Sequence, residues 1–135
     1  MNAFIITLDD KPGELARVTE AIATKGIDIT SFAGVTCGGD GSIALLTNDE
    51  AGTRRALGDG GFRVKEIEVQ SASLDNRPGE LAKVARKLAD AGVNIECALP
   101  TGMAGSTVTI AIGTSDPARA RGLLGTKERT SVGLG

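Results

Sequence analysis

The sequence contains no histidine, no tyrosine and no tryptophan. Histidine is the side chain that most often serves as a general base or a metal ligand at neutral pH, so its absence argues against many hydrolases and metalloenzymes. The cysteines also lack the histidine partner that usually activates a catalytic thiolate. We therefore expect a protein that is not an enzyme, with no catalytic residue, no bound metal and no cofactor.

Aromatic side chains are scarce, because Phe4, Phe32 and Phe62 are the only ones. They are scattered among apolar residues and do not form the aromatic strand pattern on which RNA-binding modules stack bases, so we expect them in the core. The formal net charge of −2 offers no attraction to polyanions or to anionic membrane surfaces. We expect neither nucleic acid nor membrane as a partner.

The sequence also has no apolar run of about 20 residues, which is the length that a transmembrane helix needs. The apolar segment 1–8 is too short for a secretory signal and has no basic start. Cys37 and Cys97 are too few for a disulfide framework, and we expect both as structural thiols, buried or half-buried. Together these features predict a cytoplasmic protein.

The sequence does contain an internal repeat. Asp10–Val18 (DKPGELARV) returns as Asn76–Val84 (NRPGELAKV), 66 positions later. The same offset matches further pairs: Leu8 with Leu74, Gly26 with Gly92, residues 43–47 with 109–113, and Leu57 with Leu123. The chain therefore divides into two copies of one unit, residues 1–69 and 70–135. Units this small bury only a modest core, so we expect them to pair, and we expect a homodimer.

The sequence predicts the same structure for the first half of each copy. A short apolar strand, at 4–8 or 71–74, leads into a Pro-Gly pair, and the prolines suit the first helical turn, where a missing N–H costs nothing. Apolar residues at helical spacing predict an amphipathic helix in each copy: Leu15, Val18 and Ile22 in the first, and Leu81, Val84 and Leu88 in the second. Gly26 and Gly92 are placed to end these helices in a left-handed conformation.

The second halves also correspond. In the first copy we predict a strand from Ile27, a turn at 38–41, a strand at 42–46, a helix capped by Asp49 with Leu57 inward, and a strand at 63–69. In the second we predict a strand from Val93, a turn at 102–105, a strand at 107–112, a helix capped by Asp116 with Pro117 first and Leu123 and Leu124 inward, and a weaker strand at 130–134. The order βαββαβ, twice, predicts an α+β fold of two ferredoxin-like units, each an antiparallel sheet with two helices on one face.

The repeated Pro-Gly pair is the best candidate for a binding site. The first N–H groups of a helix have no partner within the helix and carry a partial positive charge, so they attract a carboxylate. Gly13 and Gly79 have no Cβ and allow a ligand to approach the backbone. The simpler alternative is that Pro-Gly only starts a helix tightly. Asp9 and Asp10 form a carboxylate pair that could serve catalysis or hold Mg²⁺, but Asn76 replaces the second of them in the other copy.

The combination resembles the ACT domain family, small ligand-binding regulatory modules associated with enzymes of amino-acid metabolism. The resemblance rests on DKPGEL with Gly26-Ile-Asp-Ile in the first copy and on NRPGEL with Gly92-Val-Asn-Ile in the second, and it covers almost the whole chain. It implies that two modules pair and that an amino acid or a similar small carboxylate binds at their interface. The loop before the first helix would supply backbone groups, and the polar residue of the Gly-Val-Asn-Ile segment would come from the facing module.

Carried over to this chain, the resemblance implies two sets of ligand-binding residues. They are Asp10, Lys11, Pro12, Gly13, Glu14 and Leu15 with Asn94, and Asn76, Arg77, Pro78, Gly79, Glu80 and Leu81 with Asp28. An asparagine amide can donate and accept, whereas an ionised aspartate only accepts and repels a carboxylate. If only one site is occupied, we predict the one that uses Asn94.

The leading hypothesis is a stand-alone tandem sensor that binds a small amino acid and acts on a partner enzyme or regulator. Ligand binding can act only through different affinities for two states, so a partner or a change of assembly is needed. The alternative is a constitutive interaction module that uses its sheet edges and binds no ligand. An enzyme that uses carboxylates alone is a third interpretation, with no base, nucleophile or metal cluster to support it.

Overall fold

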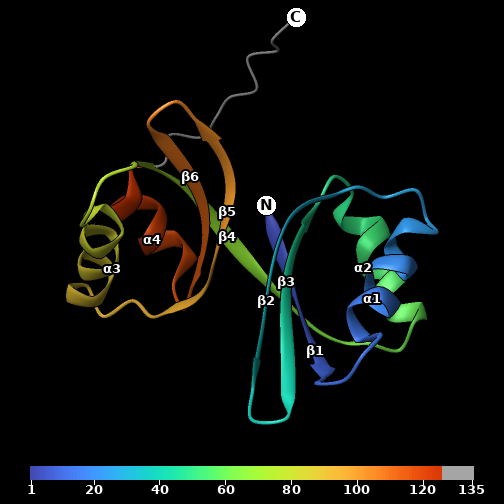
Figure 1. The fold of residues 1–135 in the computed structure, drawn as a ribbon. Coiled ribbons are helices and arrows are strands. Elements are labelled where there is room, and N and C mark those ends of the chain that lie inside the picture. Colours follow the sequence, from blue (N-terminus) through green and yellow to red (C-terminus); the bar gives the residue numbers. More distant parts are fainter. Residues whose placement is uncertain (126–135) are drawn as a thin grey trace, which may run out of the picture. The chain divides into compact units, whose positions relative to one another are not determined.

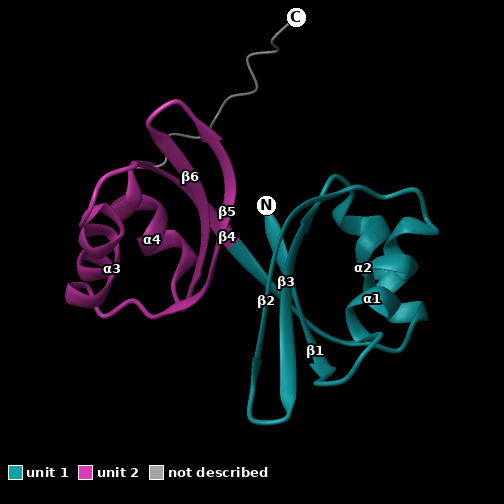
Figure 2. Cartoon of the chain, viewed as in Figure 1, with its two compact units in different colours: residues 1–68 teal, residues 69–135 magenta. Residues whose placement is uncertain are grey.

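The computed structural model describes residues 1–125. The chain forms two compact units, Met1–Glu68 (unit 1) and Val69–Gly135 (unit 2), coloured separately in Figure 2. Each combines helices with antiparallel strands, so the predicted α+β, ferredoxin-like fold is confirmed. Within the described residues, no helix has the length and apolar character needed to cross a membrane.

Unit 1 contains β1 (Asn2–Asp9), α1 (Glu14–Ala23), β2 (Ile29–Cys37), β3 (Asp40–Thr47), α2 (Glu50–Asp59) and the first half of β4 (Arg63–Asp75). Its strands lie in the order β2-β3-β1-β4, all neighbours antiparallel, with both helices on one face (Figure 1). Alternate β1 side chains share a face, so Phe4, Ile6 and Leu8 pack together against Val18 and Ile22 of α1.

Unit 2 contains the second half of β4, α3 (Glu80–Asp90), β5 (Ile95–Ala104), β6 (Thr107–Thr114) and α4 (Pro117–Leu124). Its strands lie in the order β4-β6-β5. The strands predicted at 63–69 and 71–74 are one continuous strand of 13 residues, in which 63–68 pair with β1 and 69–75 pair with β6. The strand predicted at 130–134 lies outside the described residues.

The hairpin β5–β6 of unit 2 contains one residue more than the equivalent hairpin β2–β3 of unit 1. β2 pairs Ile29 with Thr47, and β5 pairs Ile95 with Thr114, so the offset between units grows from 66 on the first strand to 67 on the second. The extra residue is Thr101, at a bulge between Pro100 and Gly102, and its hydroxyl donates to the carbonyl oxygen of Thr109 at 3.2 Å.

This insertion corrects two of the predicted matches. Residues 43–47 correspond to 110–114, not to 109–113, and Leu57 corresponds to Leu124, not to Leu123. A constant offset could not detect one extra residue in a segment where few identities remain. The bulge absorbs the insertion, so both hairpins still place their apolar residues on the core side.

The predicted caps of the second helices are confirmed. The Asp49 side chain accepts a hydrogen bond from the N–H of Gly52 at 2.9 Å, and the Asp116 side chain accepts one from the N–H of Arg119 at 3.2 Å. Pro117 is the first residue of α4. The left-handed glycines after the first helices are also confirmed, with φ of 70° at Gly26 and 71° at Gly92.

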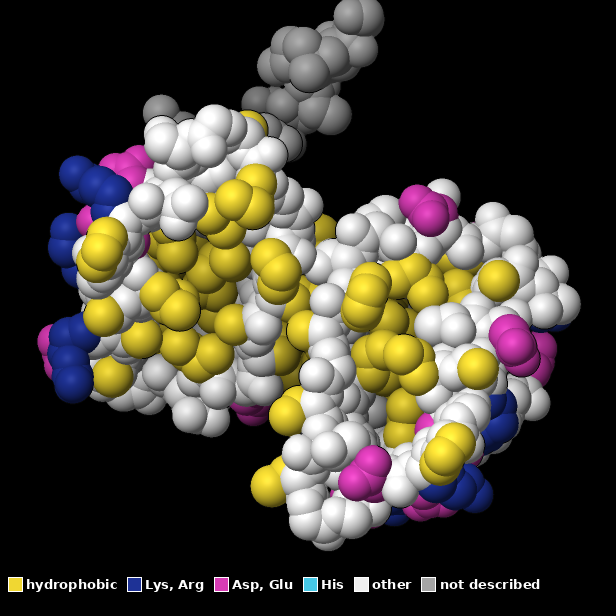
Figure 3. Space-filling view, viewed as in Figure 1, with side chains coloured by type: hydrophobic (Ala, Val, Ile, Leu, Met, Phe, Trp, Pro, Cys, Tyr) yellow, Lys and Arg dark blue, Asp and Glu magenta, His cyan; other side chains and the backbone are white. Residues whose placement is uncertain are grey.

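The core of unit 2 is less completely covered than that of unit 1. Val84 and Leu124 are only partly buried, whereas the equivalent Val18 and Leu57 are almost inaccessible. In each unit, Figure 3 shows hydrophobic side chains at the surface between the strands and the helices.

The first residue of each predicted apolar helix stripe is exposed. Leu15 is 52% accessible and Leu81 is 58% accessible, while Glu14 is buried on the side where the stripe was expected to begin. The predicted inward position of these two leucines is therefore wrong. Glu14, Val18 and Ile22 recur every four residues on the buried face of α1, and Leu15 lies about 100° around the helix from Glu14. Leu81 has the equivalent position in α3.

Two other burial predictions are wrong. Phe32 is 63% accessible, because it lies on the edge strand β2, whereas Phe4 is fully buried and Phe62 packs against the core as expected. Cys37 is exposed at the end of β2, while Cys97 is half-buried as predicted. Neither cysteine takes part in a disulfide bond.

Candidate functional site: the two Pro-Gly loops

The loop between β1 and α1 and the loop between β4 and α3 have the same backbone conformation. The N-cap residue is Gly13 in one and Gly79 in the other, with φ of 91° and 88°. The helices therefore begin one residue after the glycine, and Pro12 and Pro78 lie in the preceding turn, not in the first helical turn as predicted. A left-handed residue cannot belong to the helix, so the glycine fixes where it starts.

The loops are anchored in equivalent ways. The N–H of Asp10 donates to the carbonyl oxygen of Gly39 at 3.2 Å, and the N–H of Asn76 donates to that of Ser106 at 2.6 Å. Each loop is thus tied to the turn of the neighbouring hairpin. The side chains of Asp10 and Asn76 do not cap the helices.

The helix N-termini are open. Neither α1 nor α3 has a side-chain hydrogen bond at its N-cap, in contrast to α2 and α4. A Cβ placed on Gly13 or Gly79 would meet no atom within 4 Å, so the space above each glycine is free of described atoms. The first backbone N–H groups of both helices therefore lack the side-chain acceptor that usually satisfies one of them.

The glutamate that follows each glycine is held by cations of its own helix. The Arg17 guanidinium donates to the Glu14 carboxylate at 3.1 Å, and this hydrogen bond is the main reason why the pKa of Glu14 is lowered. The ammonium of Lys83 donates to the Glu80 carboxylate at 3.0 Å and lowers the pKa of that group in the same way. Both glutamates are therefore ionised and neutralised near the loops.

The second position of each loop carries a cation with a different role. Lys11 makes only a loose ion pair with Asp9, with 3.9 Å between the Lys11 Nζ and an Asp9 carboxylate oxygen. Arg77 contacts two carboxylates, at 3.0 Å from Asp75 and 3.4 Å from Glu80. Lys11 is thus the less restrained of the two cations, and the two loops are not electrostatically equal.

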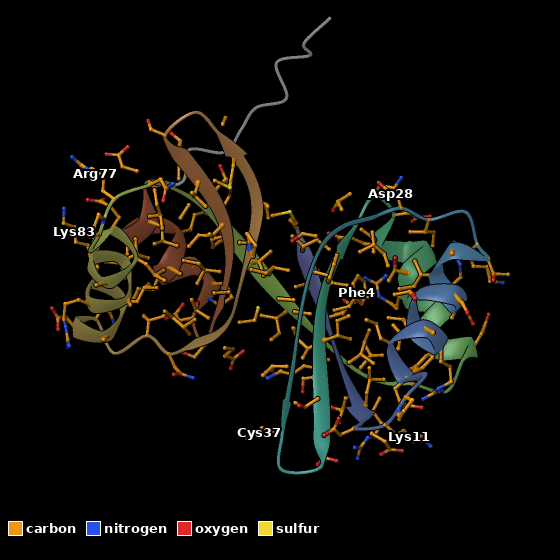
Figure 4. All side chains as sticks on the ribbon, viewed as in Figure 1. Phe4, Lys11, Asp28, Cys37, Arg77 and Lys83 are labelled. Atoms are coloured by element: carbon orange, nitrogen blue, oxygen red, sulfur yellow. The ribbon has the colours of Figure 1, made fainter. Side chains whose placement is uncertain are left out.

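Asp28 and Asn94 lie at the opposite end of their own units from the loops. In unit 1, Asp9 and Cys37 both pair with Asp40 at one end of β3, whereas Ile29, next to Asp28, pairs with Thr47 at the other end. Figure 4 shows Lys11 and Asp28 at the two ends of unit 1. The structure therefore does not bring a loop and the polar residue of the same unit together.

The backbones of these polar residues make matching hydrogen bonds. Asp28 exchanges two with Asn48, through the Asn48 side-chain oxygen at 3.0 Å and the Asn48 N–H at 3.1 Å. Asn94 does the same with Ser115, at 3.0 Å and 2.9 Å. These bonds fix the backbone positions and leave both side chains exposed, a pairing that sequence reasoning missed because its partners are 20 residues or more away.

Two surface depressions accompany these features. A shallow groove of about 610 Å³ runs along α3 from Gly79, lined by Gly79, Ala82, Lys83, Ala85, Arg86 and Ala89. Its alanines recur at helical spacing, a pattern that is visible in the sequence. A smaller one of about 260 Å³ in unit 1 is lined by Lys25, Ile27, Asp49, Gly52, Arg55 and Asp59. No group of three or more metal-ligating side chains occurs within residues 1–125.

No protein-family model matches the sequence, and no curated protein matches it. Solved structures do match. The chain is similar to the crystal structure of protein BT0572 from Bacteroides thetaiotaomicron, at 27% identity and a TM-score of 0.77, over 92% of this chain and 85% of that one.

The same fold occurs in two further solved structures. One is the regulatory subunit of aspartate kinase from Thermus thermophilus in its ligand-free form, at 21% identity and a TM-score of 0.63, over 91% of this chain and 87% of that one. The other is aspartokinase alpha and beta subunits, at 24% identity and a TM-score of 0.60, over 91% of this chain and 89% of that one. At these identities the likeness establishes the fold.

Proposed function

We propose that this chain is a regulatory protein of the ACT-domain type, in which two ACT-like domains, residues 1–69 and 70–135, bind an amino acid or a similar small carboxylate at their Pro-Gly loops. The observation that carries the proposal is that both Pro-Gly loops lead into a helix with an open N-terminus. Each of these helices has a left-handed glycine as its N-cap and no side-chain cap. The fold shared with a regulatory subunit of aspartate kinase supports a regulatory role.

The loops supply what a carboxylate needs. Uncapped N–H groups at the positive end of a helix dipole can donate hydrogen bonds to an anion, and the space above Gly13 lets the anion approach the backbone. Lys11, which is only loosely paired, adds a positive charge beside the same loop. In the second loop Arg77 is engaged by Asp75 and Glu80, so we assign the stronger site to the Asp10–Leu15 loop.

The polar residue comes from a facing ACT-like domain, because Asp28 and Asn94 lie at the far end of their own units. The Asn94 amide is exposed and can hold either the carboxylate or the ammonium of an amino acid. A ligand held between two domains favours the assembly in which they face each other. The partner protein would be controlled through that shift, since the ligand acts only by its different affinity for the two states.

A constitutive interaction module remains the second candidate, and the exposed apolar side chains of β2 favour it. Thermal-shift measurements on each amino acid separate the two functions. An extrinsic dye is required because the chain has no tryptophan or tyrosine. A rise in melting temperature with one or a few amino acids supports the sensor, and no rise with any of them contradicts it.

The site is then tested by calorimetry with the amino acid that stabilises the protein. Asn94→Ala should weaken binding about tenfold or more, as expected for the loss of a hydrogen bond to a charged group. Asp28→Ala is the matched control, at the equivalent exposed position, and should leave the stronger site intact. Unchanged affinity in Asn94→Ala would show that the assignment of this residue is wrong.

A further inference from the structure

The depression in unit 1 has a floor that depends on a glycine. It is lined by Lys25, Ile27, Asp49, Gly52, Arg55 and Asp59, the last three of which lie on one side of α2. A Cβ on Gly52 would collide with the Asp49 carboxylate and would lie 2.9 Å from Cδ1 of Ile27. Gly52 and Ile27 are both buried, so the floor of the depression is closed and apolar.

The wall at Asp49 is held in one position by hydrogen bonds. Its side chain accepts the N–H of Gly52 at 2.9 Å, and its own N–H donates to the Thr47 hydroxyl at 3.3 Å. Its carbonyl oxygen accepts the N–H of Thr53 at 3.0 Å and the Thr53 hydroxyl at 2.7 Å. A wall fixed in this way has little to reorganise when a ligand binds.

Three charged side chains at the rim have no ionic partner inside the protein. In the part of the chain that the structure describes, Lys25, Arg55 and Asp59 form no ion pair. Arg55 and Asp59 are four positions apart on α2, a spacing at which opposite charges can pair. All three side chains are exposed, so each can contact a charged group of a ligand.

The residues that make the depression are not required by the fold. Unit 2 has the same cap at the start of its second helix, formed by Asp116. In unit 2, however, the residues equivalent to Lys25, Gly52 and Arg55 are Ala91, Arg119 and Gly122. Both cations are therefore missing there, and a long side chain replaces the glycine of the floor. This difference favours a binding role for the three residues of unit 1 over a structural one.

We propose that this depression binds a small zwitterion, a molecule with one carboxylate and one ammonium group joined by a short carbon chain. The carboxylate contacts Lys25 and Arg55, the ammonium contacts Asp59, and the carbon chain lies on Gly52 and Ile27. A lone anion would also face the rim acids, and a lone cation would face the rim cations, so a molecule with both charges fits better. The volume of about 260 Å³ is below the range of drug-sized ligands, about 300–1,000 Å³, and suits a small metabolite.

Amide NMR of the full chain tests for binding. The probes are glycine, L-alanine and L-valine, each titrated at constant ionic strength, and the N–H signals of Gly52 and Ile27 report on the floor. At least one probe should shift both signals saturably. Acetate and methylammonium, which each carry one of the two charges, should bind about tenfold more weakly. No saturable shift with any of the three zwitterions overturns the proposal, and so does acetate that binds as tightly as they do.

Substitutions at the rim test the contacts. Arg55→Gln and Lys25→Ala should each raise the Kd of the probe about tenfold, because each removes a charge-assisted hydrogen bond to its carboxylate. Lys87→Gln is the control, since it removes one exposed positive charge from α3 in unit 2 and should leave the Kd unchanged. Circular dichroism checks that all three variants fold. Unchanged affinity in both rim variants, or equal weakening in all three, contradicts the site.

The site lies within unit 1 and needs no facing domain, so it does not depend on the proposed function. Asn94→Ala should leave the Gly52 and Ile27 shifts unchanged, while the N–H signal of Gly13 reports on binding at the Asp10–Leu15 loop. Shifts at Gly52 without shifts at Gly13 would refute the loop site and support this one. Shifts at Gly13 without shifts at Gly52 would refute this one and leave the loop site standing.

Discussion

Arg17 contacts two residues from different parts of unit 1: its guanidinium donates to the Glu14 carboxylate at 3.1 Å and lies over the Phe62 ring, 4.3 Å from the ring centroid. The arginine thereby connects the glutamate after the Pro-Gly pair with the segment that leads into β4. In unit 2 the equivalent residue is Lys83, which makes the ion pair with Glu80 as a point charge and has no planar group to stack.

The first prediction concerns the pKa of Glu14. Because the Arg17 hydrogen bond is the largest cause of its lowered pKa, Arg17→Gln should raise that pKa toward the usual value of 4.5. NMR titration of the side-chain carboxyl carbon measures it. Lys83→Gln should raise the pKa of Glu80 and leave Glu14 unchanged. If the Glu14 titration is the same in Arg17→Gln, the ion pair does not exist in solution.

The same shift predicts how stability depends on pH. A carboxyl whose pKa is lower in the folded state contributes stability above its unfolded pKa, and this contribution is lost as the pH falls through the folded pKa. The urea concentration at the unfolding midpoint of the wild type should therefore decrease as the pH is lowered below about 4.5, and Glu14→Gln should reduce that decrease. Denaturation series between neutral and acidic pH check this, and parallel curves for the two proteins would refute it.

Substitution of the loop glycine should destabilise the protein without any steric clash. Gly13 has φ of 91° and no atom near its missing Cβ, so Gly13→Ala is disfavoured by its backbone conformation alone, by about 1–2 kcal/mol. Gly58, within α2, is the control of opposite sign. It also has open space and an ordinary φ, so Gly58→Ala should stabilise by about 0.5–1 kcal/mol. Urea denaturation distinguishes the two, and equal effects would contradict the left-handed loop.

Two leucines of α3 should respond differently to truncation. Leu88 is fully buried, and Leu88→Ala should cost about 2–5 kcal/mol, enough to unfold much of unit 2. Leu81 is 58% accessible, and Leu81→Ala should change the free energy of unfolding by less than about 0.5 kcal/mol. A large loss in Leu81→Ala would mean that the leucine packs against something in solution, such as a facing domain.

Capping of α2 gives a further test. Asp49→Ala removes the acceptor for the N–H of Gly52 and should cost about 1 kcal/mol in the free energy of unfolding. Asp59 at the other end of the same helix is the control, because an acidic group near a helix C-terminus is mildly unfavourable. Asp59→Ala should therefore be neutral or slightly stabilising in the same denaturation assay. Equal losses in both variants would indicate a general charge effect.

The order of the elements could be predicted because its signals are local. The helices were found from apolar spacing, and Asp49, Asp116, Gly26 and Gly92 mark helix ends by chemistry that acts within a few residues. What could not be predicted depends on position in the sheet. An apolar residue such as Phe32 has the same local pattern on an edge strand as on a central one.

The candidate site illustrates the same limit. The Pro-Gly loops were located correctly, but the glycine, not the proline, proved to set the helix start, because only the left-handed φ of Gly13 separates the turn from the helix. The hydrogen bonds that fix Asp28 and Asn94 come from Asn48 and Ser115. No local pattern in the chain connects those residues.

The bulge and the proline of β5 have a consequence for a chain that carries the same unit twice. A molecule with two equally adhesive edge strands could add a further copy at each end, and such an assembly grows without limit into a filament. β2 and β5 share an irregularity near their start, between Ile29 and Ser31 and between Ile95 and Cys97, and β5 has a second one at Thr101, beside Pro100, so β5 is the less suited of the two to accept a further strand. The single inserted residue thus makes the two edges of a duplicated protein unequal and protects one of them from such growth.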